Sequence, residues 1–194
     1  MTLAGFEKLN GTKESMWAKL NRCYLVQLEL VPLGLLLLAC YLVFTAYPLL
    51  PANIPTHFNI AGVSDDWGDK SEIFIYPGLS ALFYLMFTGI NIWLAIANDP
   101  RQLINLPRAR KATLTNAQVE QLRVFLNRAL FLLKTLMQGL NTYSAYITIE
   151  VALGRASTLG APWFLFLLGI LAVAGHMVWQ SFSLTRPRRQ VQSK

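Results

Sequence analysis

Charged residues are scarce in this chain: Asp, Glu, Lys and Arg make up 14% of its 194 residues, whereas hydrophobic residues make up 54%. Ordinary soluble domains carry about 25% charged residues, because their surface must face water. The shortage of charge therefore excludes an ordinary water-soluble domain. The apolar residues are concentrated in long runs, which is typical of helices that cross a lipid bilayer.

Cysteine is nearly absent, with Cys23 and Cys40 as the only two. Both fall within what reads as one helix, and the α-helical rise would separate them by about 25 Å. That distance excludes a disulfide between them, and no cysteine spacing typical of a zinc site is present. We interpret both as ordinary buried thiols, so cysteine usage leaves the redox compartment open.

Catalytic signatures are missing as well. The sequence has no HExxH pair, no nucleophile elbow and no phosphate-binding glycine loop, and neither histidine lies near a candidate serine or cysteine in sequence. The acidic residues match no calcium-loop spacing. We therefore expect a protein that is not an enzyme and that has no catalytic residues and no metal.

Four apolar segments approach or exceed the ~20 residues that a helix needs to cross a bilayer. We predict an all-α integral membrane protein that forms a single transmembrane domain over residues 1–194. Its spans are expected at about 24–50, 73–97, 126–153 and 161–185, with an outer loop at 51–72, a cytoplasmic loop at 98–125 and a basic tail at 186–194. The third span is the most polar, and its charges lie near its ends, where side chains can reach head groups.

Basic residues are unevenly distributed between these spans. The segments expected on one side carry most of them: Lys8, Lys13, Lys19, Arg22, Arg101, Arg108, Arg110, Lys111, Arg123, Arg186, Arg188, Arg189 and Lys194. The two loops on the other side contribute Lys70 and Arg155. The positive-inside rule then places both termini in the cytoplasm. We expect the net charge of +7 to contact anionic lipid head groups, not nucleic acid.

Two further helical features are predicted on the cytoplasmic side. Residues 12–24 place Met16, Trp17, Leu20 and Tyr24 at helical spacing beside basic residues, which indicates an interfacial helix on the inner leaflet. Thr115 followed by Gln118 is a capping box. It lies well before the third span, so we expect one helix of about 57 Å, from Asn116 to Leu153, that extends into the cytoplasm.

The outer loop is the most informative stretch. Ile54-Pro-Thr-His-Phe-Asn is followed by Gly62, Asp65, Trp67-Gly68 and Lys70, and then by Phe74 and Pro77. This ordered run, within about residues 47–85, resembles the signature of a bacterial multi-pass membrane family of unknown function that includes the SdpI-type immunity proteins. The loop residues that carry the resemblance are Pro55, His57, Asn59, Gly62, Asp65, Trp67, Gly68 and Lys70. We expect an ordered loop whose carboxylates accept bonds from its own backbone N–H groups.

The resemblance implies a bacterial cytoplasmic (inner) membrane protein and, in some members, protection against a secreted toxin or sequestration of a transcriptional repressor. It implies no known catalytic activity. We therefore favour an immunity, sensor or envelope-protection factor of the SdpI-like type. The alternative is an accessory subunit of a larger respiratory or photosynthetic membrane complex, in contact with a tetrapyrrole or lipid.

Polar residues within the spans are costly and so are functional candidates. Glu29 and Lys134 enter the first and third helices at similar depth, and we expect an ion pair between them. Gln138 and Asn141 continue a polar stripe from Lys134 to Thr148, which we expect to face the other helices and to bond Asn91. Glu150 lies near the outer end, within reach of the His57 loop or of Arg155.

His176 is the one histidine inside a predicted span. Ala172, one turn earlier, and the adjacent Gly175 leave space for a flat tetrapyrrole bound through the imidazole. The other interpretation is a helix-contact residue bonded to a partner helix. The other histidine, His57, lies in the predicted outer loop. A single chain therefore has only one histidine within the membrane and cannot supply the two axial ligands of a bis-histidine haem.

Overall fold

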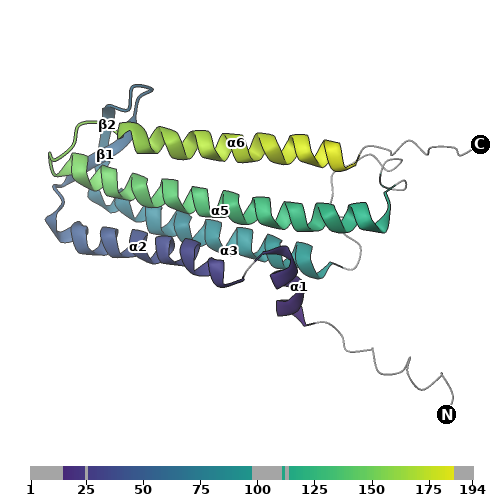
Figure 1. Ribbon diagram of the computed structural model, residues 1–194. Helices are drawn as coiled ribbons and strands as arrows, with labels where there is room; N and C mark the ends of the chain where they lie inside the picture. The colour runs from purple at the N-terminus through teal and green to yellow at the C-terminus, as the bar shows by residue number, and fades with distance from the viewer. Residues whose placement is uncertain (1–14, 25, 98–110, 112–113, 186–194) are drawn as a thin grey trace, which may run out of the picture.

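The computed structural model describes residues 15–24, 26–97, 111 and 114–185, which are mostly helical. Four long helices lie side by side, and a two-stranded hairpin covers one end of this bundle, here called the hairpin end (Figure 1). The helices are α1 (Met16–Cys23), α2 (Leu30–Ala46), α3 (Ile75–Ile96), α5 (Asn116–Ala152) and α6 (Gly160–Leu184); the strands are β1 (Asn53–Phe58) and β2 (Ser64–Asp69). Most of the basic residues used for the orientation, including the tail 186–194, lie outside the described residues.

Three helical segments are long and apolar enough to cross a membrane: Val26–Leu49, Lys70–Ile96 and Gly160–Leu184. The first consists of α2 with a short 3₁₀ turn at each end, the second of a 3₁₀ turn followed by α3, and the third of α6 alone. Many of their large apolar side chains are exposed, among them Leu37 on α2, Leu85 on α3 and Leu165 on α6. Such apolar surface on several sides is typical of helices surrounded by lipid.

The first predicted span, at about 24–50, lies close to the observed segment Val26–Leu49. The expectation that Cys23 and Cys40 share one helix is wrong, because α1 ends at Cys23 and Tyr24 adopts an extended backbone with φ −159° and ψ 161°. The Asn21 side-chain oxygen accepts a hydrogen bond from the Val26 N–H, which holds the chain in this bend. Cys23 and Cys40 therefore lie on different helices, not on one.

α1 packs against the bundle with one face. Leu20 and Cys23 are buried against Ala95 of α3 and neighbouring residues of α5, whereas Met16 and Trp17 are exposed. Burial raises the pKa of the Cys23 thiol. In Figure 1, α1 runs across the direction of the four long helices at the end opposite the hairpin. Leu20, expected on the lipid-facing side, instead belongs to the protein core.

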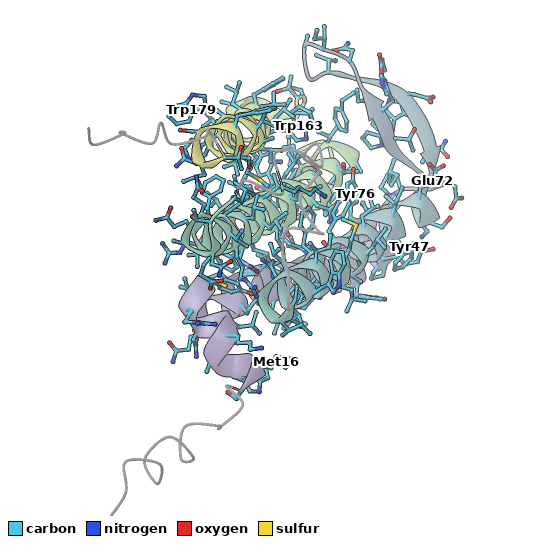
Figure 2. The ribbon with its side chains drawn as sticks, turned by 90° about the vertical axis from the view of Figure 1, so that its right-hand side faces the viewer. Met16, Tyr47, Glu72, Tyr76, Trp163 and Trp179 are labelled. Atoms are coloured by element: carbon cyan, nitrogen blue, oxygen red, sulfur yellow. The ribbon has the colours of Figure 1, made fainter. Side chains whose placement is uncertain are left out.

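α5 is the central helix of the bundle. Its predicted start is confirmed: Thr115 caps the helix, and Gln118 completes the capping box. Its 37 residues correspond to about 55 Å. α2, α3 and α6 all pack against it, and the view along the bundle places it between α6 on one side and α2 and α3 on the other (Figure 2).

The predicted outer loop contains a β-hairpin, so the all-α prediction is corrected there. β1 and β2 pair antiparallel, from Asn53 opposite Asp69 to Phe58 opposite Ser64, with irregular register around His57. Ile54 of β1 is buried against Val43, Ile73 and Ile149 of the helices. The sequence of β2, SDDWGD, lacks the alternation of apolar residues by which strands are recognised, because it faces away from the helices.

Asp69 joins the hairpin to α3, and its pH response is a testable consequence. Its carboxylate accepts a hydrogen bond from the Ser71 N–H at 2.7 Å. The bonds from Ser71 lower the pKa of Asp69, and the charge of Lys70 adds to this effect. A lowered folded-state pKa means that this stabilisation is fully present above the unfolded value of about 3.9 and is lost as pH falls through the folded-state pKa.

We therefore expect Trp67 fluorescence, as a reporter of the hairpin, to stay constant from about pH 7 to pH 5 and to change below about pH 4. The Asp69→Asn variant, which cannot ionise, should lack the part of this transition that belongs to Asp69. Superimposable titration curves for the two proteins would contradict the assignment.

Candidate functional site

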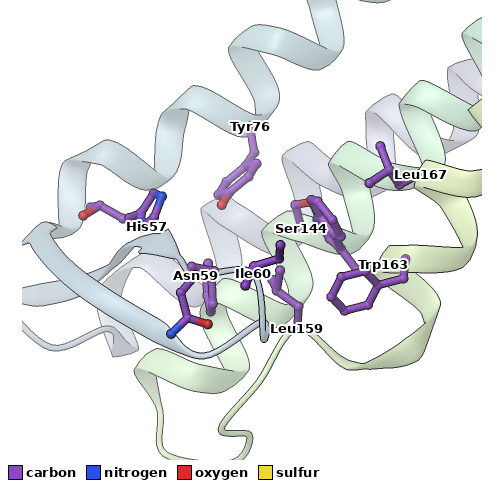
Figure 3. A pocket seen from close by; sticks show the side chains of 11 residues that line it. His57, Asn59, Ile60, Tyr76, Ser144, Leu159, Trp163 and Leu167 are labelled. Atoms are coloured by element: carbon purple, nitrogen blue, oxygen red, sulfur yellow. The ribbon is translucent and has the colours of Figure 1, made fainter. Parts of the chain in front are cut away.

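A cavity of about 470 Å³ opens beneath the hairpin, between β1, α3, α5 and α6. We call it the hairpin pocket. Its lining is mostly apolar and consists of Thr56, His57, Phe58, Asn59, Ile60, Tyr76, Ser144, Leu159, Trp163, Phe164 and Leu167. Figure 3 shows Tyr76 on one side of the pocket and Trp163 and Leu167 on the other, with residues of the hairpin across it. A concave apolar site with few polar groups is the usual form of a ligand pocket.

Part of the sequence motif lines this pocket. The four consecutive residues Thr56, His57, Phe58 and Asn59 all line it. Pro55 lines a neighbouring cavity of about 230 Å³. The structure thus assigns part of the motif to a cavity wall, which the sequence did not predict.

Asn59 and Gly62 shape the tip of the hairpin. The Asn59 side-chain oxygen accepts bonds from the backbone N–H groups of Ala61 and Val63. Gly62 has φ +76°, a conformation that other residues adopt at a cost, and a Cβ there would lie 3.3 Å from Leu159. The Gly62 carbonyl accepts a bond of 2.8 Å from the Leu159 N–H, so the hairpin tip is fastened to the chain that leads into α6.

His57 and Asp65 form a pair on the exposed side of the hairpin. Their Nδ1 and Oδ1 atoms are 2.5 Å apart, and the side chains are 66% and 44% exposed. The bond joins β1 to β2 across the irregular register. Among the described residues, no group of three or more His, Cys, Asp or Glu side chains is placed to hold a metal ion. The pair is chemically suited to orient the His57 ring at the pocket rim.

Other residues of the predicted outer loop stabilise the hairpin from outside the pocket. Asp66 and Asp69, which are not part of the motif, accept bonds from the backbone N–H groups of Trp67 and Ser71, as predicted for the carboxylates of this loop. Gly68 is closely packed, since a Cβ there would lie 2.8 Å from Thr56. The Lys70 ammonium lies 4.8 Å from the centre of the Tyr47 ring, a cation–π contact with the end of α2.

Among the pocket residues that the sequence did not predict, three carry polar side-chain atoms: Tyr76, Ser144 and Trp163. The Tyr76 hydroxyl lies 2.8 Å from Thr148 Oγ1, and the Trp163 indole donates to Ser144 Oγ at 3.1 Å. Tyr76 and Trp163 lie near the hairpin ends of α3 and α6, the height at which membrane proteins place aromatic rings. That placement was the available signal, but only the packing of helices distant in sequence brings them together.

The predicted ion pair within the bundle is confirmed. Lys134 Nζ lies 2.6 and 2.7 Å from the two carboxylate oxygens of Glu29, and it also donates to Thr88 Oγ1 at 3.1 Å. The Lys134 side chain is 0% exposed. The Tyr24 hydroxyl donates to the same carboxylate at 2.7 Å. All three N–H groups of the ammonium therefore have acceptors, as a buried charge requires.

The polar stripe of α5 faces the bundle and bonds mainly to α3. Gln138 donates to the Ser80 carbonyl, and Asn141 donates to Ser80 Oγ and to the Tyr76 carbonyl, each at 2.7 Å. Asn91 was expected to bond this stripe. It donates instead to Asn127, nearly two turns before Lys134, so that part of the prediction was wrong.

Glu150 pairs with Arg155 and not with the His57 loop. The two side chains share two bonds of 2.8 and 2.9 Å. His176 lies on α6 with an exposed side chain and contacts the rings of Phe125 and Trp179. It borders a cavity between α5 and α6.

Comparisons with known proteins agree with this description at a coarse level. Residues 34–81, from α2 through the hairpin into α3, match a family described as a domain of unknown function, DUF1648, which is membrane-associated. A protein of Archaeoglobus fulgidus described as uncharacterized is 28% identical over 154 residues, which cover 77% of this chain and 80% of that protein. No solved structure matches. The matched domain and the three membrane-length helices together support a helical membrane protein built around the hairpin segment.

Proposed function

We propose that this chain is an SdpI-like envelope-protection factor of the bacterial inner membrane, which captures an amphipathic peptide in the hairpin pocket and acts without catalysis. α2, α3, α5 and α6 cross the membrane in this proposal, with both termini in the cytoplasm and the hairpin outside. The observation that carries the proposal is the apolar pocket beneath a hairpin that contains the family-like motif.

A fourth span through α5 is consistent with its burial. α5 is less apolar than the other three long helices, but its polar face, from Lys134 to Thr148, is buried against neighbouring helices. Lipid therefore does not meet the polar stripe. The membrane core disfavours unpaired polar groups, and the side-chain N–H groups of Gln138 and Asn141 donate to α3. Gln138 Oε1 is buried and has no hydrogen-bond partner among the described residues.

A peptide is favoured because the pocket combines an apolar cavity with a strand edge. Within the described residues the sheet has only two strands, so β1 has one edge that no strand pairs. Exposed strand edges bind extended peptides through backbone hydrogen bonds, and adjacent pockets select the side chains. β1 residues Thr56 to Phe58 line the cavity, which places the edge and the pocket together.

Filling the pocket should abolish protection. We expect bacteria that produce the wild-type chain to survive a secreted membrane-active peptide, identified by screening a panel of such peptides, at concentrations at least about tenfold higher than bacteria without it. Leu167→Trp, which places a larger ring in the pocket, should remove this difference, because one misfit in a binding pocket costs on the order of a tenfold loss. Survival curves at matched protein levels provide the measurement.

The matched control is Leu168→Trp, because Leu168 is the next residue on α6, is 61% exposed and lies outside the pocket. It should protect like the wild type. Labelling of a cysteine introduced at Asn59 from the outer side of intact cells checks the topology in the same strains. Protection by Leu167→Trp equal to that by Leu168→Trp, or no protection by any strain, would overturn the proposed function.

A further inference from the structure

A second cavity, of about 360 Å³, lies between α5 and α6 toward the end opposite the hairpin. We call it the α5–α6 groove. It is lined by Phe125, Arg128, Ala129, Leu132, Ala172, Val173 and His176. The lining is almost entirely apolar except for Arg128 and His176, both of which are exposed. The groove shares no residue with the hairpin pocket.

Helix geometry gives the depth of this groove in a bilayer. The hydrocarbon core is about 30 Å thick, which corresponds to about 20 residues of α-helix. Counted from the hairpin end of α5 at Ala152, that thickness ends near Leu132, and Arg128 lies one turn beyond it. Trp179 on α6 is 64% exposed and contacts His176, as expected of an aromatic side chain at the membrane surface. Arg128 is thus at head-group height, whereas Leu132, Ala172 and Val173 lie at acyl-chain height.

Arg128 is held in place from one side. Its Nε donates to the Cys23 carbonyl at the end of α1, at 2.7 Å. A guanidinium has five N–H donors, so this bond fixes the plane of the group and leaves its two terminal nitrogens as donors for a phosphate. An arginine anchored in this way is already oriented for binding, which lowers the entropic cost of recognising an anion.

We propose that the α5–α6 groove binds an anionic phospholipid of the inner leaflet, with its phosphate on Arg128 and one acyl chain along Leu132, Ala172 and Val173. Charge complementarity and depth select this occupant: the cation lies at one end of the groove and the apolar walls lie below it. Basic pockets between membrane helices on the cytoplasmic side are known to bind such head groups. The proposal depends on the membrane topology but not on any ligand of the hairpin pocket.

Native mass spectrometry of the purified full chain tests this site. In detergent micelles containing phosphatidylglycerol, we expect one retained lipid per chain, and an apparent affinity about five- to tenfold higher than for phosphatidylcholine, as one arginine contact near a membrane surface provides. Arg128→Gln should remove that preference. Arg155→Gln, at the hairpin end, should retain it.

Because Arg128→Gln also alters the bond to Cys23, a second variant tests the groove separately. Ala172→Leu fills the apolar part from α6 and should reduce retention of phosphatidylglycerol at least about fivefold. Inorganic phosphate, added alone, should not compete at equal concentration, since it lacks the acyl chain. Unchanged lipid retention in both variants, competition by inorganic phosphate, or a visible absorbance band from a tetrapyrrole at His176 would overturn the proposal.

Discussion

Replacing Glu29 with glutamine is expected to lower the free energy of unfolding by about 3–5 kcal/mol, because the substitution leaves the Lys134 ammonium buried without its counter-charge. The carboxylate accounts for two of the three acceptors of that ammonium, at 2.6 and 2.7 Å, and the lysine side chain has no exposed area. Thr88 is the remaining acceptor and carries no charge. Glutamine keeps the size of the side chain, so the measured loss reports charge and not a cavity.

Unfolding by SDS in mixed micelles measures this effect. The double variant Glu29→Gln with Lys134→Met should regain most of the lost stability, because replacing both charges of a buried pair is often nearly neutral. Glu150→Gln is the matched control: its partner Arg155 is 57% exposed, and such pairs contribute about 0–1 kcal/mol. A double variant as unstable as Glu29→Gln alone would show that the two side chains do not act as a pair.

Replacing Gly139 with leucine is expected to cost about 1–3 kcal/mol by forcing α6 away from α5. A Cβ at Gly139 would lie 2.5 Å from the Phe166 ring, closer than atoms in contact can approach. Phe166 is on the same helix as Trp163 and Leu167, so a displaced α6 also changes one wall of the hairpin pocket. Both the SDS unfolding midpoint and Trp163 fluorescence should report the change.

Two variants separate this contact from other effects of losing a glycine. Gly175→Leu on α6 has no heavy atom within 4 Å of its Cβ, so it should leave stability unchanged or raise it by up to about 1 kcal/mol through helix propensity. Gly139→Leu combined with Phe166→Ala should recover part of the loss by making room for the new side chain. Equal destabilisation by Gly139→Leu and Gly175→Leu would contradict a specific helix contact.

The ion pair between Glu29 and Lys134 is a tertiary contact that the sequence alone predicted correctly. Glu29 and Lys134 are 105 positions apart, yet their equal depth in two apolar segments was enough to pair them. Charges in lipid have few available partners, and this limits the alternatives. Asn91 was assigned incorrectly because an uncharged amide has many acceptable partners at neighbouring depths, and only the stagger of α3 against α5 selects Asn127.

The break after α1 and the hairpin were decided by tertiary contacts. The apolar pattern continues across residue 24, but the Asn21 side chain and the packing of Leu20 against the other helices end α1 at Cys23. The strands form because Ile54 is buried against three helices, and this burial has no counterpart in the sequence of β2. The apolar pattern of a segment predicts a helix or strand only where the buried side chains belong mostly to that segment.

By itself, the sequence determined the apolar segments, the capped start of α5 and the buried polar stripe, because hydrophobicity, capping and helical period act over a few residues. The tertiary structure alone decided the hairpin pocket and the α5–α6 groove. The hairpin pocket is bounded by the hairpin, α3, α5 and α6, and the groove by residues far from the loop that joins α5 to α6. The shape of each cavity depends on how closely the surrounding helices pack. That spacing is set by pairs of residues on facing helices, such as Gly139 and Phe166, and not by either residue alone.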